Sequence, residues 1–307
     1  MKLLSIVVCT IGKTETLQDS LEEILLQIRN SDVELVLVAN NQKSFDLLKS
    51  FNFRDDNKLS IHFEEKIGLS FARNRGVKEA SGEYVLFTDD DAFLSEGFID
   101  ELFKTLKSNK HDIVGGPIKP FFLTGKAKWF KEDYETLYFG EQGRNLKENE
   151  FLYGPNIIIK KEIINHIGGF DPSFGLRGEK IYLGEEIDIQ IRARKKGYKV
   201  FYNPDLLVKH YIEKRKTSLS YVVLRRFQSA QSNFFLFSKD NCIVDTCFYL
   251  LRQGVIIVFR LLTFFFRDRN KWPHWQQYFI EEFLRRTEAF VWLFLCIKKS
   301  FRLDKIL

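Results

Sequence analysis

The chain has 307 residues, 45% of them hydrophobic and 29% charged, which is an ordinary composition for one large folded domain or two smaller ones. Its charge is uneven. Residues 209–307 hold 18 Lys or Arg and 8 Asp or Glu, a net +10, whereas the rest of the chain holds 29 and 33, a net −4. A mildly acidic first part and a basic, aromatic last part indicate two regions with different partners.

The cysteines and the first residues indicate a cytoplasmic protein. Cys9, Cys242, Cys247 and Cys296 have neither the spacing of a metal site nor that of a disulfide framework, so reduced thiols are expected. The start, "MKLLSIVVCT", resembles a signal peptide, but its apolar stretch is short and no small-residue cleavage site follows. A first buried β-strand is the preferred interpretation.

The first hundred residues alternate short apolar strands with helices. Strands are predicted over 3–9, 33–40, 59–63 and 84–87, since each is a short apolar run. Apolar residues at helical spacing predict a helix between the first two strands, and a second helix is expected over 69–82, ended by Gly82. This alternation predicts an α/β fold with a mostly parallel sheet.

The next hundred residues continue the pattern around one long loop. A helix is expected over 98–107, a strand near 112–120, a strand and short helix over 156–171, and a helix stopped by Gly197 before another strand. Residues 121–152 have no steady periodicity, which predicts a loop or lid. Trp129, Tyr134 and Tyr138 in it are expected either to stack on sugar rings or to pack beneath the loop.

Three consecutive aspartates, Asp89 to Asp91, follow the strand over 84–87. In open α/β sheets, ligands bind outside the carboxyl ends of the strands. Mg²⁺ and Mn²⁺ prefer carboxylate oxygens, and Mg²⁺ is commonly held by one or two carboxylates together with substrate phosphates. The alternative is a helix N-cap, for which one aspartate is enough. The sequence therefore favours a site for a metal-bound diphosphate.

A second acidic cluster, Glu185, Glu186 and Asp188, opens a predicted helix. Arg192 and Arg194 follow at spacings that allow simple ion pairs along the helix. Beside a metal-binding cluster, however, an additional carboxylate is a natural general base. Both interpretations stay open on the residues alone.

Five segments in order resemble family-2 glycosyltransferases of the GT-A fold: "SIVVCT", "LVLVANN", "GLSFARNRGVKEASGEYVLFTDDDA", "GPNIIIKKEIINHIGGFD" and "GEEIDIQIRARKKGYKVFYNPDLLVKH". The resemblance covers about residues 1–212, which would form the glycosyltransferase domain, and 213–307 would form a helical, aromatic and basic extension. In one place the chain departs from the family. Ala39 stands at the end of the second strand, where the family usually has an aspartate near the nucleotide base.

The resemblance implies a role for each matching residue. Asp89 would face the ribose and share the metal, Asp91 would be the main metal ligand, and His210 would complete the metal site. Glu186 matches the catalytic base, with Glu185 as the alternative. The residues expected to line the donor site are Thr10, Asn40, Arg73, Asp89 and Asp90.

The extension over 213–307 has the features of a membrane-surface segment. Residues 247–266 have the length of a membrane span, but Arg252 and Arg260 make a spanning helix costly. The two arginines lie on one side of a helix, which fits a helix lying along the interface with its arginines toward the headgroups. The alternative is a helical subdomain that packs its aromatic residues on the catalytic core. Peripheral membrane contact is the preferred prediction.

Together these observations predict an enzyme that uses Mg²⁺ or Mn²⁺, and the family resemblance implies that the transfer inverts the anomeric carbon. It would move a sugar from a nucleotide donor, UDP-linked, to a glycan or lipid-linked acceptor in cell-surface polysaccharide synthesis, at the cytoplasmic face of the membrane. No nucleic-acid partner is expected. The rival predictions are a metal-dependent nucleotidyl or phosphoryl transferase, and a non-catalytic membrane-associated scaffold on the same fold.

Overall fold

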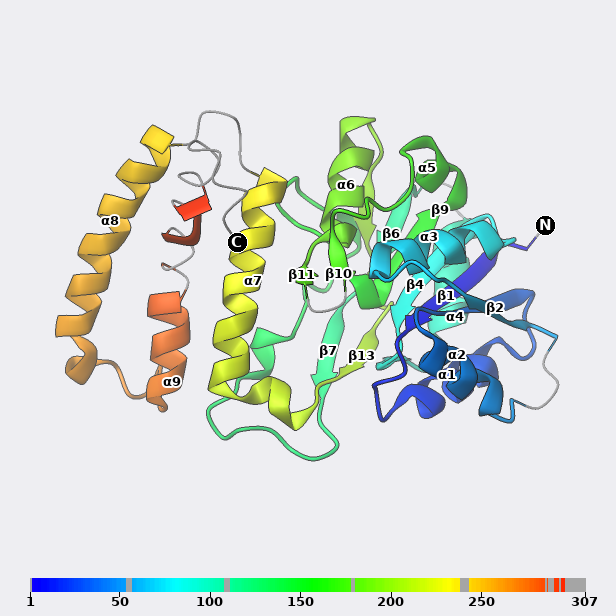
Figure 1. Ribbon diagram of the computed structural model, residues 1–307, viewed down its shortest axis with the longest axis horizontal. Helices are drawn as coiled ribbons and strands as arrows, with labels where there is room; N and C mark the ends of the chain where they lie inside the picture. Colours follow the sequence, from blue (N-terminus) through cyan, green and yellow to red (C-terminus); the bar gives the residue numbers. More distant parts are fainter. Residues whose placement is uncertain are drawn as a thin grey trace. The chain divides into compact units, whose positions relative to one another are not determined.

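The apolar runs of the first two hundred residues form an eight-stranded sheet, in the order β3-β2-β1-β4-β9-β6-β12-β8 (Figure 1). Its strands are β1 (Leu4–Thr10), β2 (Val33–Ala39), β3 (Leu59–Phe63), β4 (Tyr84–Asp89), β6 (Ile113–Gly115), β8 (Arg144–Asn145), β9 (Ile157–Lys160) and β12 (Val200–Tyr202). Strands β3, β2, β1 and β4 are parallel, as are β6 and β12, while β9 and β8 run antiparallel to their neighbours. The predicted mostly parallel α/β fold is confirmed.

The structure, a computed structural model, describes residues 2–53, 57–107, 111–177, 180–237, 243–284, 286, 290–292 and 294–295. They divide into two compact units. The first comprises residues 1–123, 132–181 and 185–212, and the second comprises 124–131, 182–184 and 213–307. That these units act as the catalytic domain and the membrane-associating region stays a prediction.

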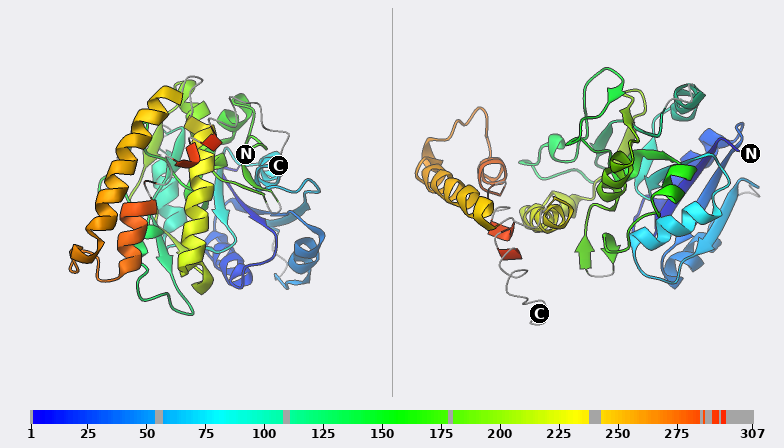
Figure 2. Two further views of the ribbon diagram at one scale, coloured as in Figure 1. Left: turned by 60° about the vertical axis from the view of Figure 1, so that its left-hand side comes forward. Right: turned by 90° about the horizontal axis from the view of Figure 1, so that it is seen from above.

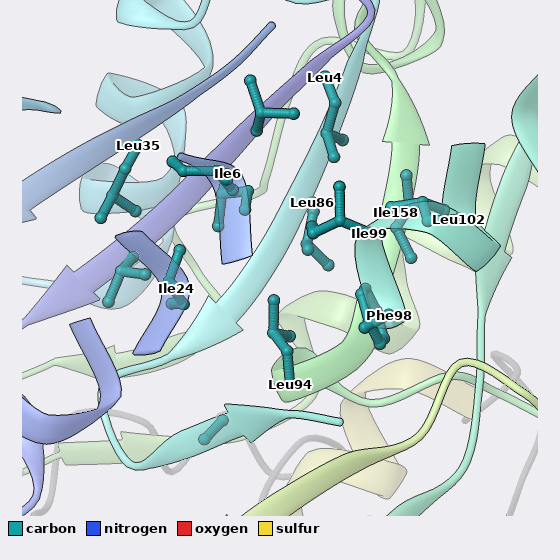
Figure 3. Packing of buried hydrophobic residues seen from close by; sticks show 14 of the residues in the cluster. Leu4, Ile6, Ile24, Leu35, Leu86, Leu94, Phe98, Ile99, Leu102 and Ile158 are labelled. Atoms are coloured by element: carbon teal, nitrogen blue, oxygen red, sulfur yellow. The ribbon is translucent and has the colours of Figure 1, made fainter. Parts of the chain in front are cut away.

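Helices cover both faces of the sheet because successive strand residues point to opposite sides. Leu4 and Ile6 of β1 pack in one cluster with α1 (Leu17–Ile28), α2 (Gln42–Ser50) and α4 (Phe98–Lys107), as Figure 3 shows for α1 and α4. Val7, the residue after Ile6, packs in the other cluster with α3 (Leu69–Glu79), α5 (Lys161–His166) and α6 (Glu185–Lys195). Each fully buried Leu or Ile contributes about 1.5–3 kcal/mol to stability, so the two clusters fix the strands firmly beneath the site.

A smaller sheet lies beyond the end of β4. It consists of β5 (Ala92–Leu94), β13 (Val208–Tyr211) and β7 (Ile118–Phe121), with β13 in the middle. Strand β13 is antiparallel to β5 and parallel to β7. A separate two-stranded sheet pairs β10 (Gly175–Arg177) with β11 (Lys180–Tyr182), and short 3-10 turns occur at η1 (Glu132–Tyr134) and η2 (Gly154–Asn156).

Two glycines were predicted to end helices, and one of them does. Gly197 follows α6 with a φ of 89°, a conformation that suits glycine after a helix. Helix α3 instead ends at Glu79, three residues before Gly82. Gly82 is needed for close packing, because a Cβ atom there would lie 2.6 Å from the backbone nitrogen of Ser5. The prediction that Gly82 ends the helix is wrong.

The second unit is helical. It contains η3 (Lys214–Thr217), α7 (Leu219–Phe237), α8 (Ile243–Leu262), η4 (Phe264–Phe266), α9 (Trp275–Tyr278) and the π-helical turn η5 (Phe279–Leu284). Helices α8 and α9 lie side by side (Figure 2), and the Tyr278 hydroxyl donates to the Arg260 carbonyl at 3.1 Å. Among the helices that the structure describes, none is both long enough and apolar enough to cross a bilayer.

The predicted loop over 121–152 is largely irregular and is shared between the units. Its residues 124–131 are held in the second unit, where Gln277 Nε2 donates to the Trp129 carbonyl at 2.8 Å and Lys131 pairs with Glu281 at 2.5 Å. The Trp129 side chain is buried, so it packs beneath the loop and is not free to stack on a sugar. Tyr138 is half exposed and keeps that possibility.

Candidate active site

The three aspartates lie at the carboxyl end of β4, next to the end of β1. Asp89 is the last residue of β4 and stands in register with Cys9 of β1. Asp90 and Asp91 then form the turn into β5, and the Asp91 side chain is buried. In a sheet of this topology, the crevice at these strand ends is where ligands bind.

Strand pairing brings His210 to the aspartates. Because β13 is antiparallel to β5, His210 stands opposite Ala92, the residue after Asp91. His210 Nε2 lies 2.9 Å from Asp91 Oδ1, and the backbone N–H of Tyr211 donates to the Asp91 carbonyl at 2.8 Å. One ligand atom each from Asp89, Asp91 and His210 lies within 4.8 Å of the other two. The three residues predicted to bind metal therefore form one cluster.

Asp89 of this cluster and the adjacent Asp90 have raised pKa values, because they are buried and are repelled by Asp91. A nearby positive charge would stabilise their ionised forms. Burial raises the pKa of Asp89, the Arg73 guanidinium opposes that shift, and the neighbouring Asp91 adds to it. Burial is also the main cause that raises the pKa of Asp90 to about 6, and repulsion from Asp91 and Asp89 adds to it. Two carboxylates and an imidazole are a donor set that suits Mn²⁺, and carboxylates suit Mg²⁺. The residues therefore fit a divalent cation.

Asp90 points to the loop after β1 and holds it in place. The Thr10 hydroxyl donates to one Asp90 carboxylate oxygen, and the Thr14 hydroxyl donates to the other at 3.1 Å. Ser20 of α1 donates to the Asp90 carbonyl at 3.1 Å. Asp90 and Thr10 were both predicted to bind the donor, and the structure pairs them with each other. Their contact with a nucleotide stays a prediction.

Asn40, which follows β2, shapes the segment that leads into α3. Its amide Nδ2 donates to the carbonyls of Glu64 and Lys66, at 3.1 and 2.9 Å. Its Oδ1 accepts from the N–H of Gly68 at 2.7 Å. An aspartate has no hydrogen to donate to two carbonyls, so this arrangement requires the amide. Contact between Asn40 and the nucleotide base stays a prediction, but the side chain already has a structural task.

Arg73 of α3 joins the two acidic clusters. Its Nη1 lies 2.8 Å from Glu185 Oε1 and its Nη2 lies 3.5 Å from Asp89 Oδ1. The guanidinium is almost fully buried, 5.9 Å from the ring centroid of Phe87 and 5.5 Å from that of Phe170. A buried charge with two carboxylate partners is fixed in position, because moving it would leave all three charges unpaired. Arg73 thus links the metal cluster to the first turn of α6.

The adjacent glutamates at the start of α6 have different surroundings. Glu185 is buried and takes the ion pair with Arg73. Glu186 is partly buried, and burial together with the charge of Glu185 raises its pKa to about 8. A carboxylate poised near neutral pH is suited to accept a proton, whereas one held by a buried arginine is not. These surroundings suit Glu186 better than Glu185 to accept a proton, and the role of Glu186 as the base stays a prediction.

One buried residue that supports Glu186 was not predicted from the sequence. Gln190, fully buried, lies one turn after Glu186 and donates to its carbonyl at 2.7 Å. The same amide group exchanges two hydrogen bonds of 2.9 Å with the backbone of Leu152. The only signal in the sequence was the spacing of four from Glu186. Of the two arginines on this helix, Arg192 pairs with Asp188 at 2.6 Å, whereas Arg194 donates to backbone carbonyls.

Comparison with known proteins places this site in a family. The family model described as "Glycosyl transferase family 2" matches residues 5–168, just over half of the chain. The chain belongs to this family. The matched part contains Thr10, Asn40, Arg73 and the aspartates but ends before Glu186 and His210. The roles of those two residues therefore depend on geometry and resemblance.

The glycosyltransferase is similar in sequence to a glucosyl-dolichyl phosphate glucuronosyltransferase of Haloferax volcanii, with 28% identity over 74% of this chain and 75% of the relative. It is similar in fold to GalNAc-T7, solved with UDP, GalNAc and Mn²⁺ (TM-score 0.56, 15% identity, 76% of this chain and 51% of that one). It is also similar to the mannosyltransferase PcManGT of Pyrobaculum calidifontis, solved with GDP-Man and Mn²⁺ (TM-score 0.55, 13% identity, 99% and 76%). The GT-A-like fold and the enzyme class, a glycosyltransferase, are confirmed.

Proposed function

We propose that this glycosyltransferase moves a sugar from a UDP-linked donor to a glycan or lipid-linked acceptor, with inversion, in cell-surface polysaccharide synthesis. The observation that supports it most is the link that Arg73 makes between two acidic groups: the cluster at Asp89, which fits a cation, and Glu185 in the first turn of α6, beside Glu186, whose pKa is raised. The Haloferax relative is named for a dolichyl phosphate compound, and GalNAc-T7 was solved with UDP. Both names support the proposal for donor and acceptor.

On the donor side, Asp89, Asp91 and His210 would hold Mn²⁺ or Mg²⁺. A divalent cation bound there supplies positive charge to the diphosphate leaving group. Asp90 keeps the loop after β1 closed on the strand ends through Thr10 and Thr14. These contacts orient the pocket wall before the donor arrives, which reduces the entropy cost of positioning it.

On the acceptor side, Glu186 takes the proton of the attacking hydroxyl. As that oxygen forms its bond to the anomeric carbon, the bond from the anomeric carbon to the diphosphate oxygen breaks on the opposite face. The electron pair leaves with the nucleoside diphosphate, and the proton stays on Glu186. Arg73 keeps Glu185 neutralised, so that Glu186 is the carboxylate left to act.

The test is product analysis with a panel of nucleotide sugars, in the presence of Mn²⁺ or Mg²⁺. The proposal expects a free nucleoside diphosphate for each sugar transferred, and no release when Asp91 is replaced by alanine. Pyrophosphate as the product would support the rival nucleotidyl transferase. Full activity of Asp91→Ala would contradict the proposed cation site.

We also propose that residues 213–307 contact the membrane peripherally and that the enzyme acts at its cytoplasmic face. The net charge of this part of the chain favours anionic lipid. One detail of the prediction is changed by the structure. The Arg260 guanidinium, expected to face headgroups, lies 3.2 Å from the Glu282 carboxylate within the second unit.

A further inference from the structure

The second unit exposes an unusual amount of apolar surface along α8 and η4. We define the α8 apolar face as Val255, Val258, Phe259, Leu262, Phe265 and Phe266. Each of these side chains is 57% to 87% exposed. Monomeric soluble proteins rarely expose contiguous apolar patches of this kind unless the patch binds something.

The six residues form one stripe. Val255, Val258, Phe259 and Leu262 recur at spacings of three and four, which puts them on one side of a helix. The stripe continues beyond α8, because the N–H of Thr263 bonds to the Phe259 carbonyl and that of Phe266 to the Thr263 carbonyl. The result is a continuous apolar ridge rather than scattered hydrophobic residues.

The opposite side of α8 is the side that is anchored to the second unit. Gln253 is buried, Ile257 packs against the cluster of Trp272, Tyr278 and Phe283, and Arg260 pairs with Glu282. The helix is therefore fixed in rotation, with Arg260 toward the rest of the second unit and the apolar face outward. Arg260 was expected to face the lipid headgroups, whereas it pairs with Glu282 on the side opposite the apolar face.

The ends of the ridge are basic. Residues 252–271 contain five Lys or Arg and one acid, Asp268. Arg252 is exposed at one end, and Arg267, Arg269 and Lys271 follow the other end. An apolar stripe with cations at both ends is complementary to a bilayer of anionic lipid, where cations meet headgroups and apolar groups enter the acyl boundary.

A second copy of the chain is the poorer partner for this surface. In a two-fold symmetric pair, the same surface meets itself. Because both ends of the ridge are basic, like charges would meet whether the two helices ran parallel or antiparallel. The lipid surface has no such repulsion.

We infer that the α8 apolar face is the surface that enters the membrane, with α8 lying along the bilayer plane. This inference rests on the proposed function, because it identifies the surface that makes the proposed membrane contact. Phe265 and Phe266, the most exposed of the six, insert at the end of the ridge, beside Arg267 and Arg269.

The experiment compares full-length variants in a vesicle co-sedimentation assay. The vesicles are phosphatidylcholine alone or phosphatidylcholine mixed with phosphatidylglycerol. The test variant is Phe265→Asp with Phe266→Asp. The matched control is Leu26→Asp with Leu123→Asp, two leucines of the first unit that are also more than half exposed.

The wild type and the control should bind the anionic vesicles, and should bind phosphatidylcholine alone more weakly. The test variant should partition about ten-fold less or lower, because burying one phenylalanine side chain is worth roughly a factor of ten. Unchanged binding of the test variant overturns the inference, as does a wild type that ignores anionic vesicles.

Two parallel measurements keep the outcome clear. Hydrogen exchange of the wild-type chain needs no variant, and vesicles should slow exchange over residues 263–271; unchanged exchange there overturns the inference. Turnover with a water-soluble acceptor separates the two proposals. For the wild-type chain, turnover without binding to anionic vesicles refutes the membrane surface alone, whereas vesicle binding without turnover refutes the proposed function alone.

Discussion

Replacing Glu186 with glutamine tests the mechanism most directly, because glutamine keeps the shape of the side chain and cannot accept the acceptor proton. A positioned general base contributes about 10²–10⁴-fold to rate, so turnover should fall by that factor. Binding of the donor should change little, since Glu186 is not one of the three residues, Asp89, Asp91 and His210, that form the candidate cation cluster. The expected signature is a loss in kcat with an almost unchanged donor dissociation constant.

The structure also sets the pH dependence. Burial and Glu185 raise the pKa of Glu186 to about 8, so roughly a tenth of the molecules carry the ionised base at pH 7. Turnover of the wild type should therefore rise about ten-fold as the pH increases through 8, because the ionised form is the active one. The residual turnover of Glu186→Gln should not show this rise.

Stability gives an independent check on the same residue. Because the pKa of Glu186 is raised in the folded protein, the folded state binds more protons than the unfolded state between pH 4.5 and 8, and stability falls as the pH rises through that range. Glutamine does not ionise, so the variant avoids the free-energy cost of a buried charge at residue 186. Glu186→Gln should therefore melt at the same temperature as the wild type or higher at pH 8. A variant that melts lower would contradict the assigned environment.

The assay is steady-state release of nucleoside diphosphate, with calorimetry for donor binding. The matched control is Asp188→Asn on the same helix, which loses a pair with Arg192 worth only about 0.3–0.5 kcal/mol. Wild-type turnover in Glu186→Gln would refute the mechanism. If Glu185→Gln lost turnover without losing stability while Glu186→Gln stayed active, the base would move to Glu185.

Three further predictions follow from the site. Asp91→Ala should abolish Mn²⁺-dependent binding of nucleoside diphosphate in calorimetry, as EDTA should in the wild type; equal binding with EDTA would refute the cation site. Arg73→Met should lower stability by about 3–5 kcal/mol in urea unfolding, because it leaves Glu185 buried without its partner; an unchanged midpoint would contradict this link. Gln190→Leu should lower the free energy of unfolding by about 1–3 kcal/mol for each Leu152 backbone group, the N–H and the carbonyl, that loses its hydrogen bond. It should also lower kcat more than it weakens donor binding.

The strands and helices around the site were predictable because their signals are local. Strands β1 and β4 each contain a continuous apolar run, 6–9 and 84–87, and α1 repeats its leucines and isoleucines at helical spacing. Gly82 was misjudged because a glycine after a helical pattern resembles a helix end. Its real constraint is the backbone of Ser5, 77 residues earlier, which no local pattern contains.

The contacts that assemble the site were not predictable in the same way. His210 reaches Asp91 because β13 pairs with β5 across 119 residues, and Arg73 reaches Glu185 across 112. Only the family resemblance indicated His210, and nothing in the sequence indicated that Arg73 pairs with Glu185. The ion pair of Arg260 could not be predicted for a similar reason, since its partner Glu282 comes from another turn of the chain.

Glu185 and Glu186 are adjacent in the first turn of α6 but have different surroundings. Successive residues of a helix point about 100° apart, so Glu185 and Glu186 cannot share the single guanidinium of Arg73 equally. Glu185 takes the short contact of 2.8 Å, and Glu186 is left beside a like charge in a partly buried place, which raises its pKa. The same arginine reaches Asp89, so the residue that pairs with Glu185 also fixes one edge of the cluster proposed to bind the cation. A change at Arg73 should therefore alter both donor binding and the pH profile, whereas a change at Glu186 should alter only the chemical step.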